Sequence, residues 1–229
     1  MNTENQPDCL RLPIGIQTFR RLREKGCYYV DKTSLIRQMV DEGDFYFLSR
    51  PRRFGKSLLV STLKELFEGN EPLFRGLDIH PHWDWSVQYP VVRLTLDGKV
   101  STPESVEKNV VNQLGGIESK FGLTSLPPLT EAADRLRNLL DHLYQKTDRQ
   151  VVVLVDEYDK PVLDVLEDDE KARANRDCLR EIGLAKIAEV EITERKVPDF
   201  EEWIKNAYHE LPDDYNGEVI NLTEDMPPA

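Results

Sequence analysis

The sequence lacks the long apolar run that a membrane-spanning helix needs, since no stretch of its 229 residues approaches about 20 consecutive apolar positions. Its first ten residues are polar and acidic and do not resemble a secretion signal. Cysteine is scarce, and Cys9, Cys27 and Cys178 lie too far apart for any metal-ligand spacing. An odd cysteine count without an export signal favours reduced thiols. We therefore expect a cytoplasmic protein without a disulfide or a structural zinc.

The sequence also lacks a net positive charge. Its formal net charge of −12 argues against a protein that coats nucleic acid. The charge is unevenly distributed, because residues 197–229 contain nine acidic residues and one lysine and so carry −8 of the total. The remaining chain is only mildly acidic, and it gathers cations at Arg50, Arg52, Arg53 and Lys56. A compact basic cluster suits a phosphate ligand better than it suits the extended backbone of a nucleic acid. Nucleic acid is therefore not indicated as a partner.

The apolar pattern predicts an α/β fold. Residues 151–155 are five consecutive apolar residues, four of them β-branched, as in a central parallel strand covered on both faces. Further strands are expected at residues 28–30, 45–48 and 89–96. Helical spacing predicts helices over residues 16–25, 58–67, 103–121, 129–146 and 173–194. A further helix is expected to start at a cap formed by Asp31 or Thr33 and to run through Val40. Strands that alternate with long helices indicate a layered domain with a mainly parallel sheet.

A phosphate-binding loop is predicted ahead of the helix at residues 58–67. Such a loop needs a strand, a tight turn that presents backbone N–H groups, and a helix N-terminus whose partial positive charge favours anions. Within it, Lys56 is expected to reach the β- and γ-phosphates, and the Ser57 hydroxyl to bind Mg²⁺. The residues expected to contact the nucleotide are Arg52, Arg53, Phe54, Gly55, Lys56, Ser57 and Leu58.

The start of this loop departs from the usual pattern, G-x-x-x-x-G-K-[ST]. Arg50 stands at the first glycine position, and Pro51 beside it has no N–H to donate. Arg52 and Arg53 are expected to supply charge in place of the lost backbone donors. The alternative interpretation is a basic surface loop before a helix, since Gly-Lys-Ser is common by chance.

The predicted central strand ends in two acids, Asp156 and Glu157. In that position Asp156 is expected to hold Mg²⁺ through Ser57 and water, while Glu157 polarises the attacking water as general base. A solvated acidic turn after a core strand is the alternative. Because both halves of the site occur in the required order and on the required elements, the sequence predicts nucleotide binding.

Four short segments occur in an order and spacing that match a known family. They are Ile14-Gly15-Ile16 with Phe19, then Gly26 to Thr33, Leu48 to Leu58, and Val155-Asp156-Glu157-Tyr158-Asp159-Lys160-Pro161. Together they resemble the bacterial AAA-ATPase-like family over residues 12–180, about three quarters of the chain. The resemblance implies a P-loop NTPase-like three-layer sandwich, with Walker A-like and Walker B-like elements that bind ATP. It also implies that an arginine at the loop start is usual.

Residues 181–229 depart from the family pattern. Family members continue with further core strands, one of which ends in a polar residue that contacts the γ-phosphate, and then with a nuclease-like domain. Residues 181–229 contain no comparable apolar strand. We therefore expect a truncated member, in which a flexible lead-in (1–11) precedes a P-loop ATPase-like domain (12–180) and a divergent helical and acidic segment (181–229). The sandwich is expected to be incomplete at its C-terminal end.

Two functional hypotheses follow. The first is a Mg²⁺-dependent ATP-binding domain with at most weak hydrolysis, because the region expected to sense the γ-phosphate is missing. The second is a nucleotide-dependent protein-interaction module without turnover, whose acidic segment binds a protein partner or masks the basic loop. An arginine from a neighbouring subunit is an alternative to Arg52 or Arg53 in catalysis, which leaves oligomerisation open.

Two further groups of residues have alternative interpretations. Tyr28, Tyr29 and Asp31 precede the first core strand, where related ATPases often hold the adenine, and Asp31 is expected to contact the nucleotide. Ordinary packing is the alternative and is favoured for Tyr29. Asp159 and Lys160 are either partners of the acidic pair or a salt-bridged turn.

Overall fold

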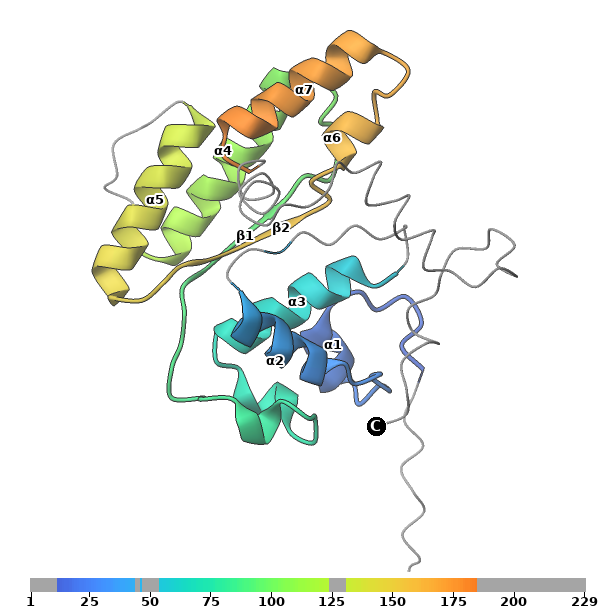
Figure 1. Ribbon diagram of the computed structural model, residues 1–229, viewed down its shortest axis with the longest axis vertical. Helices are drawn as coiled ribbons and strands as arrows, with labels where there is room; N and C mark the ends of the chain where they lie inside the picture. Colours follow the sequence, from blue (N-terminus) through green and yellow to red (C-terminus); the bar gives the residue numbers. More distant parts are fainter. Residues whose placement is uncertain (1–11, 44–45, 47–53, 124–130, 185–229) are drawn as a thin grey trace, which may run out of the picture. The chain divides into compact units, whose positions relative to one another are not determined.

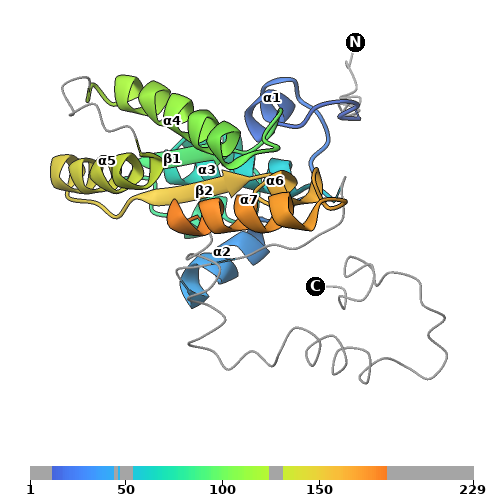
Figure 2. The same ribbon diagram turned by 90° about the horizontal axis from the view of Figure 1, so that it is seen from above.

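Two parallel strands form the centre of the described structure. The computed structural model describes residues 12–43, 46, 54–123 and 131–184, all within one compact unit, Met1–Ala188. Strand β1 (Val91–Thr95) pairs with β2 (Val152–Asp156), and the two run side by side (Figure 2). Their register places Thr95 opposite Asp156, so both strands end at the same edge.

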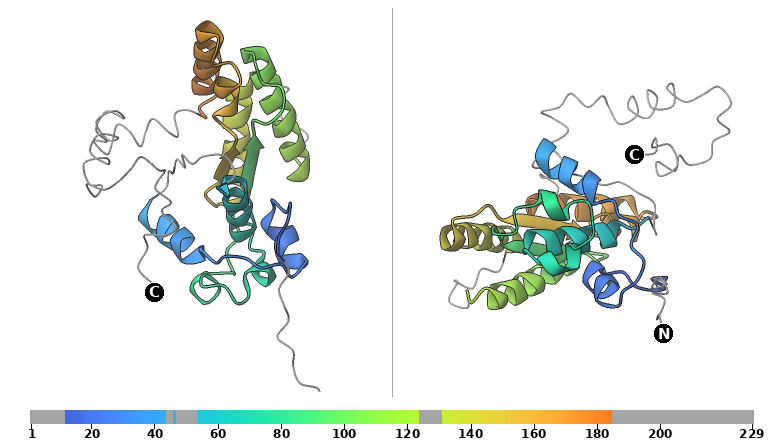
Figure 3. Two further views of the ribbon diagram at one scale, coloured as in Figure 1. Left: turned by 90° about the vertical axis from the view of Figure 1, so that its right-hand side faces the viewer. Right: turned by 90° about the horizontal axis from the view of Figure 1, so that it is seen from below.

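Alternate residues of the strands enter two separate cores, because successive side chains of a strand point to opposite faces. Val92 and Leu94 belong to the first core, whereas Val91 and Leu154 belong to the second. The first core takes side chains from α4 (Pro103–Lys120), α5 (Ala132–Thr147) and α7 (Asp169–Glu181). The second takes them from α1 (Phe19–Glu24), α2 (Thr33–Glu42) and α3 (Lys56–Phe67). The two helix groups lie on opposite sides of the strands (Figure 1 and the left view of Figure 3).

Shorter elements complete the second core and the connection after β2. Two 3₁₀ helices, η1 (Glu71–Phe74) and η2 (His80–His82), lie between α3 and β1. Near them Trp83 and Trp85 pack against the second core, and the Trp85 Nε1–H donates to the carbonyl of His80. A single turn, α6 (Lys160–Leu163), follows β2.

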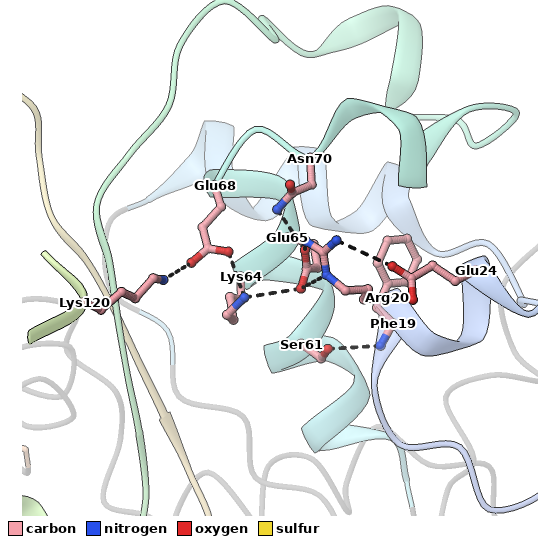
Figure 4. Close-up of polar contacts among 9 residues, drawn as sticks. All are labelled: Phe19, Arg20, Glu24, Ser61, Lys64, Glu65, Glu68, Asn70 and Lys120. Atoms are coloured by element: carbon pink, nitrogen blue, oxygen red, sulfur yellow. Dashed lines mark hydrogen bonds and ion pairs between the residues drawn. The ribbon is translucent and has the colours of Figure 1, made fainter. Parts of the chain in front are cut away.

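A buried carboxylate on α3 fixes that helix against its neighbours (Figure 4). The Glu65 side chain is 5% exposed and accepts hydrogen bonds from Arg20 Nη2 at 2.5 Å and Asn70 Nδ2 at 2.8 Å. A buried carboxylate is stable only when such donors replace water. The backbone N–H of Phe19 donates to Ser61 Oγ at 3.0 Å, which adds a second link between α1 and α3. These contacts position α3, whose first residues belong to the predicted phosphate loop.

The α/β class is confirmed, while a complete P-loop sandwich stays a prediction because the described part contains two strands.

The predicted strand at residues 28–30 is wrong, since these residues join no strand ladder. Tyr29 instead packs edge-on against Phe19, at 5.1 Å between ring centroids, and Tyr28 and Val30 are exposed. The apolar run was therefore too short and too exposed to form a strand. The strand predicted at 45–48 lies outside the described residues apart from Tyr46.

Most helices follow the predictions, with ends that move by a few residues. The helix predicted over residues 173–194 begins earlier, at Asp169, because Asp168 caps it by accepting from the Lys171 N–H at 3.1 Å. Its predicted end is wrong, since the helix ends at Glu181 and is followed by a turn in which Gly183 has a φ of 87°. Residues 1–11 and everything after residue 184 lie outside the described ranges, so the predictions of a lead-in and of a divergent acidic segment remain predictions. Among the helices that are described, none is both long enough and apolar enough to cross a membrane.

Candidate functional site

The N-terminus of α3 presents backbone N–H groups, and its N-cap residue makes no side-chain capping hydrogen bond among the described residues. Gly55 is the N-cap residue, with a left-handed φ of 78°, and its carbonyl accepts the first helical hydrogen bond from the Leu59 N–H at 2.9 Å. Glycine adopts this conformation without the steric penalty of a side chain. The N–H groups at the start of a helix have no partner within the helix, so they can bind an anion and add the favourable helix dipole.

Ser57 and Asp156 meet across the boundary between α3 and β2. The Ser57 Oγ hydroxyl donates to Asp156 Oδ1 at 3.2 Å, although the two residues lie 99 positions apart in the sequence. Asp156 ends β2 and is buried, at 5% exposure. A hydroxyl and a carboxylate are hard oxygen ligands of the kind that Mg²⁺ prefers, and Mg²⁺ at nucleotide sites takes its other ligands from phosphates and water. The residues present therefore fit a magnesium ion that arrives with a nucleotide.

Lys56 is paired with an acid of the turn after β2. Its Nζ lies 3.9 Å from Asp159 Oδ2, and both side chains are partly buried. Lys160 pairs instead with Asp164, one helical turn further along. The structure thus favours a salt-bridged turn for Lys160, whereas Asp159 contacts the phosphate-loop lysine rather than the acidic pair.

Glu157 has a strained backbone conformation. Its φ is 55°, in the left-handed region that residues other than glycine rarely adopt. Its N–H donates to Asp156 Oδ1 at 3.1 Å, and its carbonyl accepts from the Lys160 N–H. Its carboxylate has no hydrogen-bond or ion-pair partner among the described residues. Such strain costs about 1–3 kcal/mol and is concentrated at functional sites, because the surrounding structure must hold it in place.

Tyr158 follows Glu157 and is neutral at physiological pH. Burial of its ring, together with the nearby negative charge of Asp159, raises the pKa of the Tyr158 hydroxyl to about 12. The side chain also packs against the first core. It therefore adds an apolar wall beside the acidic turn and no charge of its own.

Asp31 lies in a hydrogen-bonded turn at the start of α2. Its Oδ1 accepts from the Thr33 N–H at 2.9 Å and from the Thr33 hydroxyl at 2.7 Å, and its Oδ2 accepts from the Asp78 N–H at 2.7 Å. The N-cap residue of α2 is Lys32, so the predicted cap by Asp31 or Thr33 is wrong. Asp31 instead has a structural role as the acceptor of the turn before α2 and as a link to the segment before η2. Its predicted contact with a nucleotide stays a prediction.

The other predicted loop residues divide into two groups. Arg50, Arg52 and Arg53 lie outside the described residues, so their contacts with a nucleotide stay predictions. Phe54 is described and is 49% exposed, and Leu58 packs against the second core. The side chain of Leu58 is therefore structural, and only its backbone N–H is suited to a phosphate.

Arg93 is a member of the site that the sequence interpretation missed. Its Nη2 lies 3.4 Å from Asp156 Oδ2, whereas Ser57 contacts the other oxygen of the carboxylate, Oδ1. The register pairs Arg93 with Leu154, two residues before Asp156 on the same face of β2. The available signal was a single cation, Arg93, within the mainly apolar strand predicted at residues 89–96, because such a residue needs an acidic partner nearby.

Comparisons with known proteins found a family model and a relative that are similar to this chain. The sequence model of a family described as "Predicted AAA-ATPase" (AAA-ATPase-like) matches residues 13–192, which include both halves of the site. A protein of Azotobacter chroococcum mcd 1, described only as an uncharacterized protein in the vnfD 5′ region, is 48% identical over 176 residues. That similarity covers 75% of this chain and 33% of the relative, so the chain spans about a third of the relative's length. No solved structure is significantly similar to the chain.

Proposed function

Because the chain belongs to the AAA-ATPase-like family, we propose that it binds ATP together with Mg²⁺ between the N-terminus of α3 and the end of β2. The observation that carries the proposal is the contact of Ser57 Oγ with Asp156 Oδ1 at 3.2 Å. It joins a helix N-terminus suited to phosphate with a buried carboxylate suited to a metal ion. Neither half would make a nucleotide site alone.

Each side chain of the site has a distinct role in this proposal. Lys56 exchanges its contact with Asp159 for the β- and γ-phosphates, and the N–H groups at the start of α3 bind phosphate oxygens. Ser57 and Asp156 hold the magnesium ion, which when bound neutralises phosphate charge. Arg52 and Arg53 lie next to Phe54 in the sequence and are proposed to add positive charge.

Weak hydrolysis of the γ-phosphate is the finer part of the proposal. Glu157 carries a carboxylate without a partner among the described residues, directly after the residue that holds the metal. A carboxylate in that position can orient a water molecule and accept its proton as the water attacks in line. The left-handed φ of Glu157 sets the direction of its Cα–Cβ bond in the turn after Asp156.

Removal of the metal tests the proposed site. We expect calorimetric titration to give one ATP site per chain, and excess EDTA to weaken ATP binding at least about tenfold, or about 1.4 kcal/mol, because the phosphates lose their bridging cation. Ser57→Ala should abolish most of this metal dependence, whereas Ser119→Ala, at an exposed hydroxyl on α4, should retain it. Absence of ATP binding by the wild type, or equal metal dependence in both variants, would contradict the proposal.

A further inference from the structure

Arg93 is a cation held against the carboxylate that the proposed function assigns to Mg²⁺. It stands in the middle of β1, and its side chain is 32% exposed. Its Nη2 contacts Asp156 Oδ2 at 3.4 Å. Its Nε is buried and has no hydrogen-bond acceptor within the described part of the chain. Among the described residues the guanidinium therefore makes one long contact, and its buried Nε–H has no acceptor, which is an incomplete pairing for a group with five N–H donors.

The two oxygens of Asp156 have different partners. Oδ1 accepts from the Ser57 hydroxyl at 3.2 Å and from the Glu157 N–H at 3.1 Å. Oδ2 accepts from Arg93 alone among the described residues. Within the described residues, Arg93 is the one basic side chain that forms an ion pair with this carboxylate, whereas Lys56 is paired with Asp159. The Arg93 guanidinium therefore offsets part of the negative charge of Asp156 before a metal arrives.

We propose that Arg93 is a positioning residue that holds Asp156 in the nucleotide-free protein and thereby sets the Mg²⁺ concentration that nucleotide binding requires. This inference rests on the proposed function. A metal ion that binds Asp156 must approach a carboxylate whose charge is already partly compensated, and it experiences repulsion from the guanidinium. Arg93 thus disfavours the metal alone. A metal that arrives with a triphosphate brings negative charge that offsets this repulsion, so the metal and the nucleotide bind together.

The test measures the Mg²⁺ dependence of nucleotide binding, with a fluorescent ATP analogue as the probe. Arg93→Gln should lower the Mg²⁺ concentration for half-maximal binding by about tenfold, or about 1.4 kcal/mol, because the repulsion is removed. Arg93→Met should do the same, since it removes the charge and also the buried, unpaired N–H. Both variants should show the same lowered Mg²⁺ requirement. A cooperative melting curve for each variant would show that the effect comes from the lost charge and not from a folding defect.

Arg137→Gln is the matched control, because it removes one positive charge at an exposed position of α5. It should leave the Mg²⁺ requirement unchanged. If both Arg93 variants keep the wild-type Mg²⁺ requirement, the inference is overturned. It is also overturned if they weaken nucleotide binding equally with and without Mg²⁺, because Arg93 would then contact the phosphates directly. If the wild type binds no nucleotide, the proposed function fails, and the role of Arg93 fails with it. If the wild type binds nucleotide and both Arg93 variants have the same Mg²⁺ requirement as the wild type, only the role of Arg93 fails and the proposed function stands.

Discussion

Glu157→Gln is expected to lower the rate of phosphate release from ATP by about 100- to 10,000-fold, the usual contribution of a general base. The amide of glutamine has the size of the carboxylate but cannot accept a proton from water. The Glu157 carboxylate has no hydrogen-bond or ion-pair partner among the described residues, so the substitution should not disturb the fold. Binding of ATP with Mg²⁺ should therefore stay within about twofold of the wild type. Single-turnover phosphate release, measured beside equilibrium binding, separates the two effects.

Glu167→Gln makes the same chemical change at an exposed position between α6 and α7 and should leave both quantities unaltered. Equal phosphate release by the wild type and Glu157→Gln would remove the general-base role. If the wild type binds ATP with Mg²⁺ but releases no phosphate, the chain is a nucleotide-dependent interaction module rather than an ATPase. The experiment thus distinguishes the two functional hypotheses.

Lys56→Ala is expected to weaken ATP binding by about 100-fold, or about 2.7 kcal/mol, because a charge-assisted contact with the β- and γ-phosphates is lost. The structure adds a second reason. Lys56 lies 3.9 Å from Asp159, so its removal leaves an uncompensated negative charge where the triphosphate is proposed to bind. Fluorescence titration with an ATP analogue in the presence of Mg²⁺ gives the affinity directly.

Lys108→Ala, at an exposed position of α4, removes a lysine charge away from this contact and should change the affinity by less than about twofold. If Lys56→Ala binds ATP with the wild-type affinity, the nucleotide does not bind through the predicted loop. A double variant, Lys56→Ala with Asp159→Asn, should recover part of the lost affinity because it removes the remaining repulsion.

The parts of this fold that depend on local sequence were predictable. The five apolar residues at 151–155 indicated a covered parallel strand, and β2 occupies Val152–Asp156. Helical spacing likewise indicated α3, α4 and α5. The contact between Ser57 and Asp156 was also expected, because the loop and the strand end follow one another in a recognisable order. The local pattern gave a wrong prediction at residues 28–30, which do not form a strand.

The remaining site contacts depend on register and on backbone conformation, which the sequence does not display. Arg93 contacts Asp156 only because β1 and β2 pair with Arg93 opposite Leu154. The contact between Lys56 and Asp159 depends on the turn after β2, in which Glu157 adopts a positive φ. No residue pattern distinguishes that turn from an ordinary solvated one. The buried Glu65 is similar, because its partner Arg20 lies 45 positions away on another helix.

The most direct test of the proposed site is anomalous diffraction from crystals of the chain grown with Mn²⁺ and a non-hydrolysable ATP analogue. We expect an anomalous peak within metal-ligand distance of Ser57 Oγ, about 2.0–2.1 Å for Mg²⁺, with Asp156 bound to it directly or through water. We also expect a triphosphate against the N–H groups that begin α3, and Lys56 withdrawn from Asp159. A triphosphate located away from α3, or a manganese peak that contacts neither Ser57 nor Asp156, would contradict it.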